Sequence, residues 1–455
     1  MRYVSTRGAA PELGFADVVL EGLATDGGLY VPADWPVLPP GLPADYVDLA
    51  TEVIMPFAGE DFDRDAVHRL CRDSYAVFRH PEVVPMVEIA PGHHLMELFH
   101  GPTLAFKDVA LQLLGRLFDS ILTARNERVM IVGATSGDTG SAAIDGVRGC
   151  SNVDIVILYP HGRVSDVQRR QMTTVDSPNV HTVAVQGTFD DCQDMVKAMF
   201  NDHGFRTAHN LSAVNSINWA RVMAQVVYHV AAARRLGGTV DITVPTGNFG
   251  NVLSGWIAKR MGAAVDRLVV ASNENDILTR FFESHSMDVT GVHPTLSPSM
   301  DIQVSSNFER LLFEMNHRDG AATRAQMEGF RDNGTLGIRA DQYAEWIEPT
   351  FRAGRASDHD TLATIRSVYE ETGIQIDPHT AVGVKAAREN LREGVPMVTM
   401  ATAHPAKFPD AVERATGVRP ALPEHLADLM ERPERTTVLP NDLATVQRFV
   451  ASVAR

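Results

Sequence analysis

One lysine, Lys107, lies where an amine can act as a nucleophile. It follows the apolar residues Leu104–Phe106 and opens a helical pattern with an apolar stripe over 110–121, for which Pro102 and Thr103 are suitable start signals. The positive end of a helix and partial burial both favour the neutral form of an amine. A neutral lysine can form a Schiff base with a carbonyl compound. A surface lysine whose stem covers an apolar face would show the same pattern, so this window alone does not decide.

A polar loop follows the first predicted strand, at 128–134. It carries Thr135, Ser136, Asp138 and Thr139 between glycines, directly before a predicted helix. Backbone N–H groups at such a turn can bind a carboxylate or a phosphate. Asp and Thr are also ordinary helix caps, so the loop is equally typical of a capped helix.

A second polar turn follows the predicted strand at 240–244 and precedes a predicted helix at 252–261. The turn consists of Gly247, Asn248, Phe249, Gly250 and Asn251. It is neither a Walker loop nor a G-x-G-x-x-G dinucleotide fingerprint. Because Asn, Gly and Phe as a set contribute little to helix capping, the turn favours a phosphate-binding site over a plain connection.

A third strand end, after the predicted strand at 395–400, presents Thr402. Its hydroxyl can donate a hydrogen bond to a neutral ring nitrogen, although a threonine bonded to its own backbone is the simpler explanation for this residue alone. Together, a reactive lysine, a phosphate-binding turn and a partner for a ring nitrogen fit one cofactor, pyridoxal phosphate. The joint occurrence of the three signals carries this prediction.

Strands alternate with helices from about residue 93, and this order predicts an α/β fold. Apolar runs without strict alternation indicate strands that are covered on both faces, which is typical of parallel sheets, and we expect two such sheets. The predicted strands are 128–134, 152–159, 180–185, 240–244, 267–271 and 395–400, and the helices that follow the first three begin near 141, 165 and 190. Ligands of parallel sheets bind beyond the carboxyl ends of the strands, where the three polar loops lie.

The composition is that of a globular protein of several domains, with 455 residues of which 44% are hydrophobic and 22% charged. With 41 Lys and Arg against 57 Asp and Glu, the formal net charge is −16, which argues against nucleic acids and membranes as partners. The three cysteines are far apart and predict neither a disulfide framework nor a metal site. No apolar run resembles a signal sequence or a membrane span, so we expect a cytoplasmic protein.

Several motifs together make the chain similar to the threonine synthases, which are pyridoxal-phosphate enzymes of fold type II. They span almost the whole chain and resemble the bacterial and fungal branch rather than the plant branch. The motifs are Tyr3–Gly8, Glu21–Ala24, Asp26–Pro32, Phe99–Asp108, Ala134–Gly140, Leu158–Pro160, Gly162–Ser165, Asn215–Arg221, Gly247–Asn251, Ser297–Ile302, Ser306–Arg310, Asp377–Ala381 and Thr402–Phe408.

The resemblance implies an α/β architecture like that of the tryptophan synthase β subunit, with two parallel-sheet domains and a small N-terminal domain. The implied N-terminal domain covers 1–92. The large cofactor-binding domain would combine 93–126 with 222–455, and the small α/β domain would cover 127–221.

The resemblance also assigns roles to residues. Lys107 would bind the cofactor and act in catalysis, Gly247–Asn251 would hold the cofactor phosphate, and Thr402 would face the ring nitrogen. Asp138 would lie beside the cofactor O3′, where many relatives have asparagine, so the protonation of O3′ stays open. Residues expected to bind the substrate are Thr135, Ser136 and Thr139 at its amino-acid end, and Arg163, Ser216, Asn218 and Arg221 at its phosphate. A structural ion pair is an equal alternative for each arginine.

The implied reaction converts O-phospho-L-homoserine and water to L-threonine and phosphate, with no metal. The substrate amine would displace Lys107, which would then remove the α proton as a general base and later move protons at the β carbon. Phosphate would leave from the γ carbon before water adds at the β carbon. We expect His379 and His404 to be hydrogen-bonded parts of the scaffold rather than catalytic acids.

Three alternatives stay open on the sequence alone. A phospho-lyase of the same fold would share every cofactor motif and release 2-oxobutyrate. A serine or threonine dehydratase would need no second phosphate site, and a non-catalytic protein would use the glycine turns to bind a nucleotide. The oligomeric state and allosteric control are open, although regulation by S-adenosylmethionine is not expected. Residues 310–370 show no motif, and we expect a helical covering segment there.

Overall fold

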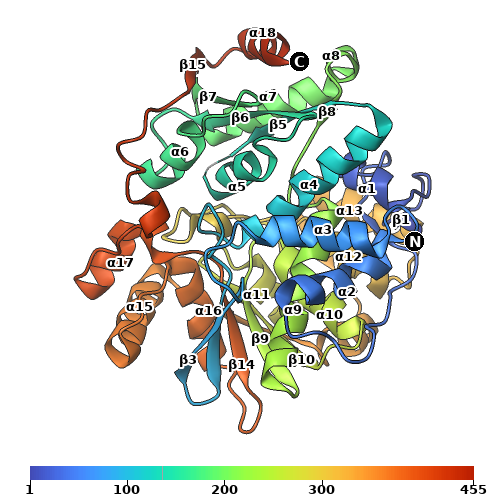
Figure 1. Cartoon of the computed structure of the whole chain (residues 1–455). Coiled ribbons are helices and arrows are strands. Elements are labelled where there is room, and N and C mark those ends of the chain that lie inside the picture. The colour runs from blue at the N-terminus through green and yellow to red at the C-terminus, as the bar shows by residue number, and fades with distance from the viewer. Residues whose placement is uncertain (136) are drawn as a thin grey trace.

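Two sheets of mainly parallel strands form the frame of the molecule (Figure 1). The computed structural model describes residues 1–135 and 137–455. In Figure 1 the five-stranded sheet lies at the top and the six-stranded sheet at the bottom. Helix α4 (Lys107–Arg125) packs against α5 (Asp138–Val147) on the smaller sheet and against α9 (Trp219–Leu236) on the larger one. The predicted α/β fold with two parallel sheets is therefore confirmed.

The larger sheet is mixed only at one edge. Its strands are β3 (Met86–Ala90), β4 (His93–Glu97), β9 (Val240–Pro245), β10 (Val265–Ser272), β13 (Phe351–Arg355) and β14 (Met397–Ala401). They are arranged in the order β13-β10-β9-β14-β4-β3, and all pairs are parallel except β3 with β4. The helices around this sheet, besides α9, are α10 (Gly250–Arg260), α15 (Asp358–Thr372), α16 (Pro378–Arg388) and α17 (Pro409–Thr416). Ile242 and Leu268 pack with α9 and α10 in one core, whereas Val269 and Ala271 pack with α16 in another, so both faces are covered.

The smaller sheet is parallel throughout. Its strands are β5 (Val129–Ala134), β6 (Val153–Pro160), β7 (Val180–Gln186), β8 (Leu211–Ser212) and β15 (Thr437–Pro440), in the order β15-β7-β6-β5-β8. The helices around it, besides α5, are α6 (Asp166–Thr173), α7 (Phe189–Asn201), α8 (His203–Ala208) and α18 (Leu443–Val453). Ile131 and Ile155 face the core that contains α4 and α5, while Met130 and Val156 face a second core with α7 and α18.

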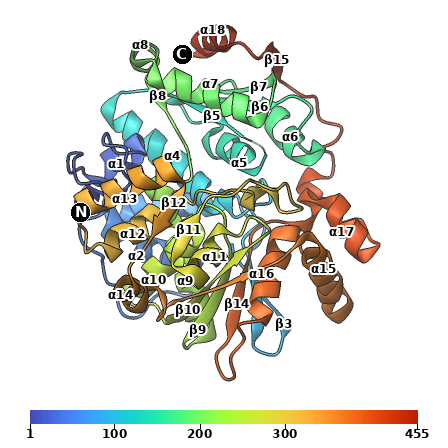
Figure 2. The ribbon, with the colours of Figure 1, turned by 180° about the vertical axis from the view of Figure 1, so that it is seen from behind.

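Two further groups of elements surround this frame. The N-terminal group consists of β1 (Tyr3–Ser5), α1 (Phe15–Glu21), β2 (Tyr30–Pro32), α2 (Tyr46–Ala58) and α3 (Arg64–Tyr75). The second group, seen from behind in Figure 2, consists of α11 (Ile277–Ser284), β11 (Ser286–Asp288), α12 (Phe308–Met315), α13 (Gly320–Asn333), β12 (Thr335–Gly337) and α14 (Ala340–Gln342). Short 3-10 turns occur at Pro298–Met300, Pro405–Lys407 and Glu424–Leu426, and a π-helical turn at Tyr343–Ile347. Residues 310–370 are largely helical, as expected, but they also supply the edge strand β13.

All six strands predicted from apolar runs are present, with ends within two residues of the expected ones. The predicted division into domains stays a prediction, but two strand pairings cross its boundaries. Strand β3, which the division places in the N-terminal domain, pairs with β4 because a tight turn at Gly92 (φ 74°) joins the two strands. Strand β15 joins the smaller sheet because α18 after it buries Val446 and Val450 in the outer core of that sheet.

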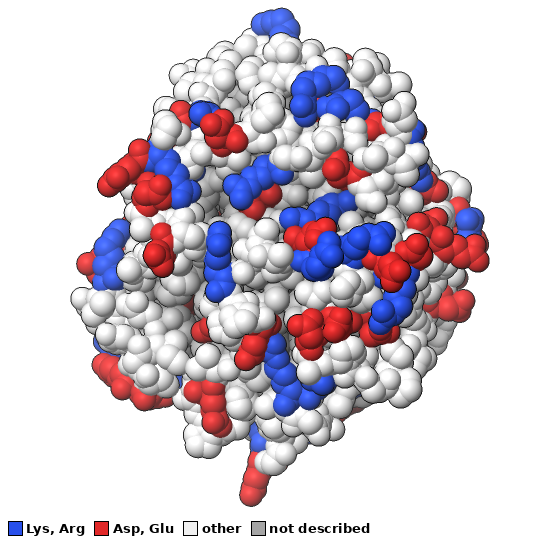
Figure 3. All heavy atoms as spheres, in the orientation of Figure 1, with Lys and Arg blue, Asp and Glu red and all other residues white. Residues whose placement is uncertain are grey.

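The surface mixes charges of both signs. Figure 3 shows acidic and basic side chains interspersed over one face of the molecule. Within residues 1–135 and 137–455, no helix has both the length and the apolar character needed to cross a membrane. The same residues contain no group of three or more His, Cys, Asp or Glu side chains arranged to hold a metal ion.

A buried ion pair anchors the N-terminal group and provides a test of the fold. Arg7 Nη2 lies 2.9 Å from Glu309 Oε2, and the two side chains are only 7% and 4% exposed. Arg7→Met leaves the Glu309 carboxylate buried without its cation, which costs about 3–5 kcal/mol of unfolding free energy. Arg2→Met is the matched control, because Arg2 pairs with Glu12 at the surface, where such a pair contributes less than about 1 kcal/mol. Urea unfolding of both variants makes the comparison, and equal losses would contradict the anchoring role.

Candidate active site

A cavity of about 1900 Å³ lies where the carboxyl ends of strands from both sheets meet. Its wall includes Ala134 at the end of β5, Pro245 at the end of β9 and Thr402 directly after β14. Lys107 also lines it, at the first turn of α4. The expectation that the three polar loops converge beyond the strand ends is therefore confirmed.

The backbone around Lys107 is fixed to the larger sheet. The N–H group of Phe106 donates to the carbonyl of Thr402 at 2.8 Å, next to a bridge between Ala105 and Ala403. Lys107 itself is 9% exposed. Its Nζ reaches the cavity and lies 4.8 Å from the centre of the Phe106 ring.

The predicted start of this helix is wrong in one respect. Thr103 does not cap α4, which begins at Lys107 after Phe106 without a side-chain cap. Instead, the N–H and the hydroxyl of Thr103 donate to the Asp108 carboxyl at 2.8 and 2.6 Å. The loop before the helix therefore closes on a buried carboxyl group at the second residue of α4.

The charges around Lys107 oppose one another. Burial lowers the pKa of the Lys107 amine, the Asp138 carboxylate opposes this by raising it, and Lys407 and Arg221 lower it further. The net effect favours the neutral amine, as expected for a nucleophilic lysine. Lys407 was not predicted as a site residue, although it lies within the family motif Thr402–Phe408.

The second polar turn adopts a strained conformation. Phe249 has φ 62°, in the left-handed region that is unfavourable for a bulky side chain. Its ring is buried and packs against Phe308 and Phe351, which holds it in place. A Cβ atom at Gly247 would lie 2.9 Å from the carbonyl oxygen of Ser299, so this position requires glycine.

The carbonyl groups of this turn are already occupied. Ser305 Oγ donates to the Gly247 carbonyl at 2.7 Å, and Asn307 Nδ2 donates to the Asn248 carbonyl at 3.0 Å. Helix α10 then begins at Gly250 without a side-chain cap. The first N–H groups of a helix have no acceptor within the helix, so they are available to an anion in the cavity.

Asn251 adds an unsatisfied donor to this turn. Its Oδ1 accepts from His229 Nε2 at 3.0 Å, whereas its buried Nδ2 has no partner among the described residues. A buried amide donor without an acceptor is unfavourable unless a ligand or water binds it. The uncapped helix, the orphan donor, the buried amine and the nearby Thr402 hydroxyl together fit the phosphate, aldehyde and ring nitrogen of pyridoxal phosphate.

Three family models match the chain. They are "Threonine synthase N terminus" over residues 2–75, "Pyridoxal-phosphate dependent enzyme" over 93–333 and "Threonine synthase, C-terminal" over 380–450. A curated threonine synthase of Pseudomonas aeruginosa is 54% identical over 464 residues, covering 99% of this chain and 98% of the relative. The chain belongs to the threonine synthase family.

Solved structures agree with this assignment. A threonine synthase from Brucella melitensis with bound pyridoxal phosphate matches with a TM-score of 0.98 and 52% identity over 100% of both chains. The yeast threonine synthase matches with a TM-score of 0.94 and 38% identity over 99% of this chain and 98% of that one. The predicted family, its bacterial and fungal affinity, its fold type and its pyridoxal phosphate cofactor are thereby confirmed. The enzyme is a pyridoxal-phosphate-dependent lyase of threonine biosynthesis.

Arg221 is the buried cation of the expected substrate site. It is 3% exposed, lines the cavity and forms no salt bridge within the described part of the chain. Its Nη1 donates to the Val214 carbonyl at 3.3 Å, but its buried Nε has no partner there. Burial lowers the pKa of Arg221 to about 10, so the guanidinium stays charged at neutral pH. The alternative of a structural ion pair is therefore wrong for Arg221.

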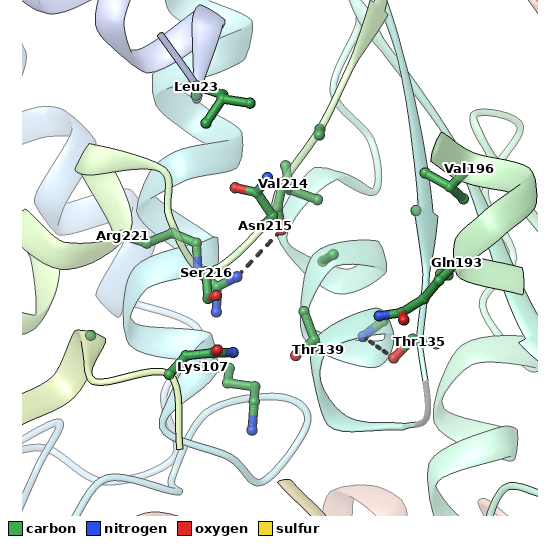
Figure 4. A pocket seen from close by; sticks show the side chains of 18 of the residues that line it. Leu23, Lys107, Thr135, Thr139, Gln193, Val196, Val214, Asn215, Ser216 and Arg221 are labelled. Atoms are coloured by element: carbon green, nitrogen blue, oxygen red, sulfur yellow. Dashed lines mark hydrogen bonds between the residues drawn. The ribbon is translucent and has the colours of Figure 1, made fainter. Parts of the chain in front are cut away.

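The other predicted substrate residues lie at different parts of the cavity. Figure 4 shows Ser216 and Arg221 on the side of the cavity that holds Lys107, with Thr135 and Thr139 on the opposite side. Arg163 lies at the cavity wall but is exposed. Ser136 lies outside the described residues.

Two of the predicted side chains, Thr135 and Asn218, stabilise the local backbone. Thr135 also lines the cavity, whereas Asn218 does not. The Thr135 hydroxyl accepts from the N–H groups of Gly137 and Gly140, each at 3.0 Å, and so shapes its own loop. Asn218 caps α9 and donates from Nδ2 to the Val19 carbonyl at 2.8 Å. Both polar groups of the Asn218 side chain are bound by backbone groups, and Asn218 does not line the cavity. The prediction that Asn218 binds the substrate phosphate is therefore wrong.

The two histidines are parts of the scaffold, as expected. His379 Nδ1 lies 2.7 Å from Asp377 Oδ2, and His379 Nε2 accepts from the Ser299 N–H at 3.2 Å. His404 Nδ1 accepts from the N–H of Ala406. Residues of the cavity wall that were not predicted include Leu23, Gln193, Asn215, Gln225, Ser299 and His379.

The buried Asp108 predicts a pH dependence of stability. Burial raises the pKa of Asp108 from 3.8 to about 7, although Thr103 opposes this. Between these values the folded protein holds a proton that the unfolded chain releases, so the contribution of Asp108 to stability falls as the pH rises from about 4 to about 7. Asn does not titrate, so the Asp108→Asn variant does not lose stability in this way as the pH rises. We expect its unfolding free energy, relative to the unsubstituted protein, to increase over this interval by up to about 1.4 kcal/mol per pH unit.

Urea unfolding near the two ends of this pH interval, with the cofactor in equal excess, measures the difference. Asp73→Asn is the matched control, because Asp73 is exposed. A difference between Asp108→Asn and the unsubstituted protein that does not change with pH would contradict the raised pKa.

Proposed function

We propose that the enzyme converts O-phospho-L-homoserine and water to L-threonine and phosphate. The observation that carries this substrate is Arg221, a buried guanidinium in the same cavity as Lys107 that has no carboxylate partner within residues 1–135 and 137–455. The uncapped start of α10 serves the cofactor phosphate, so Arg221 is available to a second phosphate. A dehydratase needs no such second site, and this favours a phosphorylated substrate.

We propose Lys107, Gly247–Asn251 and Thr402 as the residues that hold the cofactor. Bound pyridoxal phosphate supplies an electron sink for the charge left at the α carbon when its proton departs. Lys107 removes that proton, because burial and the neighbouring cations favour its neutral amine. Once it has given up this proton, the Lys107 amine can remove a proton from the β carbon, which lets phosphate leave from the γ carbon. The γ carbon then receives a proton, and water adds at the β carbon.

Two sides of the cavity orient the substrate. Arg221 and Ser216 bind the phosphate that leaves from the γ carbon, and Arg221 stabilises the negative charge that grows on it. Thr139, at the first turn of α5 opposite Lys107, binds the amino-acid end. Arg163 lies at the exposed wall, where its long side chain meets the phosphate on entry rather than during reaction. The cytoplasmic location expected from the sequence stays a prediction.

Product analysis tests the proposed function directly. The purified protein with pyridoxal phosphate and O-phospho-L-homoserine is expected to release L-threonine and phosphate in equal amounts. Lys107→Ala is expected to abolish both products, whereas Lys385→Ala keeps the activity, because Lys385 is partly exposed, pairs with Glu389 and does not line the cavity. 2-Oxobutyrate as the main product would contradict the proposal and indicate a phospho-lyase.

Two arginine variants test the phosphate site. Arg221→Met removes charged hydrogen bonds worth about 1.5–3 kcal/mol, so kcat/KM for O-phospho-L-homoserine is expected to fall about 10- to 100-fold. Arg163→Met is the comparison, because an exposed cation contributes less than about 1 kcal/mol, or about fivefold. Steady-state kinetics of both variants measures this, and a larger loss in Arg163→Met would place the phosphate at Arg163 instead.

A further inference from the structure

Lys407 carries a buried charge that the proposed reaction does not use. Its side chain is 0% exposed and stands at the end of the 3-10 turn after β14. Its Nζ lies 2.6 Å from the Thr103 carbonyl, 3.0 Å from Gln171 Oε1 and 2.9 Å from Asp138 Oδ1. The first two contacts are hydrogen bonds and the third is an ion pair, so three oxygen atoms surround an ammonium group that has three donors. Lys407 is therefore directed at protein groups and is fully buried among them.

Asp138 shares its carboxylate between Lys407 and Lys107, two of the five lysines in the chain. Its Oδ1 is close to Lys407 and also accepts from Gln168 Nε2 at 2.8 Å. Its Oδ2 lies 3.4 Å from Lys107 Nζ and 3.4 Å from Ser299 Oγ. The carboxylate is thus bound tightly on the side of Lys407 and loosely on the side of Lys107.

The charge balance of these three buried groups follows from this geometry. Two ammonium groups and one carboxylate leave one positive charge uncompensated, and an uncompensated buried charge is unfavourable. Lys407 has three acceptors, whereas Lys107 has one acceptor at a longer distance. Lys107 is therefore the amine that gives up its proton.

We propose that Lys407 is a positioning residue that holds the Asp138 carboxylate and thereby releases Lys107 from an ion pair that would keep its amine protonated. The inference rests on the proposed function, in which Lys107 reacts as a neutral amine. It also explains how a carboxylate at position 138 fits beside an anionic cofactor, because Lys407 supplies its counter-charge. Gln168 and Gln171, both from α6, fix the carboxylate and the ammonium from the smaller sheet.

Other groups act on the same three side chains. The remaining charged or titratable groups that face them are Arg221 of α9, His379 of α16 and Asp108 of α4. Burial is the main cause that lowers the pKa of Lys107, with Lys407 and Arg221 acting in the same direction and Asp138 in the opposite one. Burial alone would raise the pKa of Asp138, but Lys407 and then Lys107 lower it below its ordinary value. Substitutions at 138 and 407 therefore separate these opposing effects while Arg221 stays constant.

The test measures the Lys107 amine itself in the full chain after removal of the cofactor. Trace labelling with acetic anhydride at a series of pH values, followed by peptide mass spectrometry, gives the pH midpoint at which Lys107 becomes reactive. Lys197, whose side chain is 67% exposed, is the internal reference in the same samples. The variants are Lys407→Met, Asp138→Asn and the double variant Lys407→Met/Asp138→Asn.

The proposal requires opposite shifts in the single variants. Lys407→Met leaves Asp138 to pair with Lys107, so the Lys107 midpoint is expected to rise by about one pH unit or more. Asp138→Asn leaves Lys407 as an uncompensated cation, so the midpoint is expected to fall, and the double variant returns it towards the original value. A merely structural role for Lys407 would lower the urea midpoint without moving the labelling midpoint, and that result would overturn the proposal.

Asp138→Asn keeps the proposal falsifiable if Lys407→Met does not fold, because an unchanged or higher midpoint in this variant also overturns it. The labelling experiment does not depend on the product of the reaction. Release of 2-oxobutyrate would overturn the proposed function and leave the labelling result standing, whereas an unmoved Lys107 midpoint would overturn only the role of Lys407.

Discussion

The position of the reactive lysine depends on one backbone hydrogen bond, from the N–H of Phe106 to the carbonyl of Thr402. It fixes the start of α4 to the end of β14 in the larger sheet. The body of α4 then packs against α5 on the smaller sheet and α9 on the larger one, so a single helix relates Lys107 to both sheets. The loops after β5, β9 and β14 reach one cavity for this reason, although they are far apart in the sequence.

The cavity meets an electrostatic constraint that the overall composition conceals. The chain carries a formal net charge of −16, yet the Lys107 amine is buried near two further cations, Lys407 and Arg221, and near the Asp138 carboxylate. Such an excess of buried positive charge is costly unless anions bind or one amine gives up its proton. The phosphate of the cofactor and that of the proposed substrate provide the first remedy, and a neutral Lys107 provides the second. Anion binding and nucleophilic reactivity are thus consequences of the same distribution of charge.

Local patterns predicted those features whose causes are local. The strands followed from apolar runs, and Lys107 followed from a helix start combined with three polar strand ends. The role of Lys407 could not be predicted, because it depends on contacts with Asp138 and with Gln171, which lies 236 residues away in the chain. Asn218 shares a motif with Ser216, but the motif does not reveal which side chain points to the cavity and which caps a helix. The four-residue β15 is too short for a periodic signal, and only its pairing with β7 identifies it.

The start of α12 shows how residues away from the reacting atoms contribute to the site. Arg310 is fully buried, and although burial lowers its pKa to about 9, the guanidinium stays charged at neutral pH. It donates to the carbonyl of Tyr30 in β2 at 3.0 Å and to that of Ile217 before α9 at 2.7 Å. Asn307, one turn earlier, donates from Nδ2 to the Asn248 carbonyl of the Gly247–Asn251 turn at 3.0 Å. A planar guanidinium with fixed donor directions allows these segments little relative movement. Phe249 is therefore held in its left-handed conformation from outside the cavity, and the first N–H groups of α10 stay available for the phosphate that we propose there.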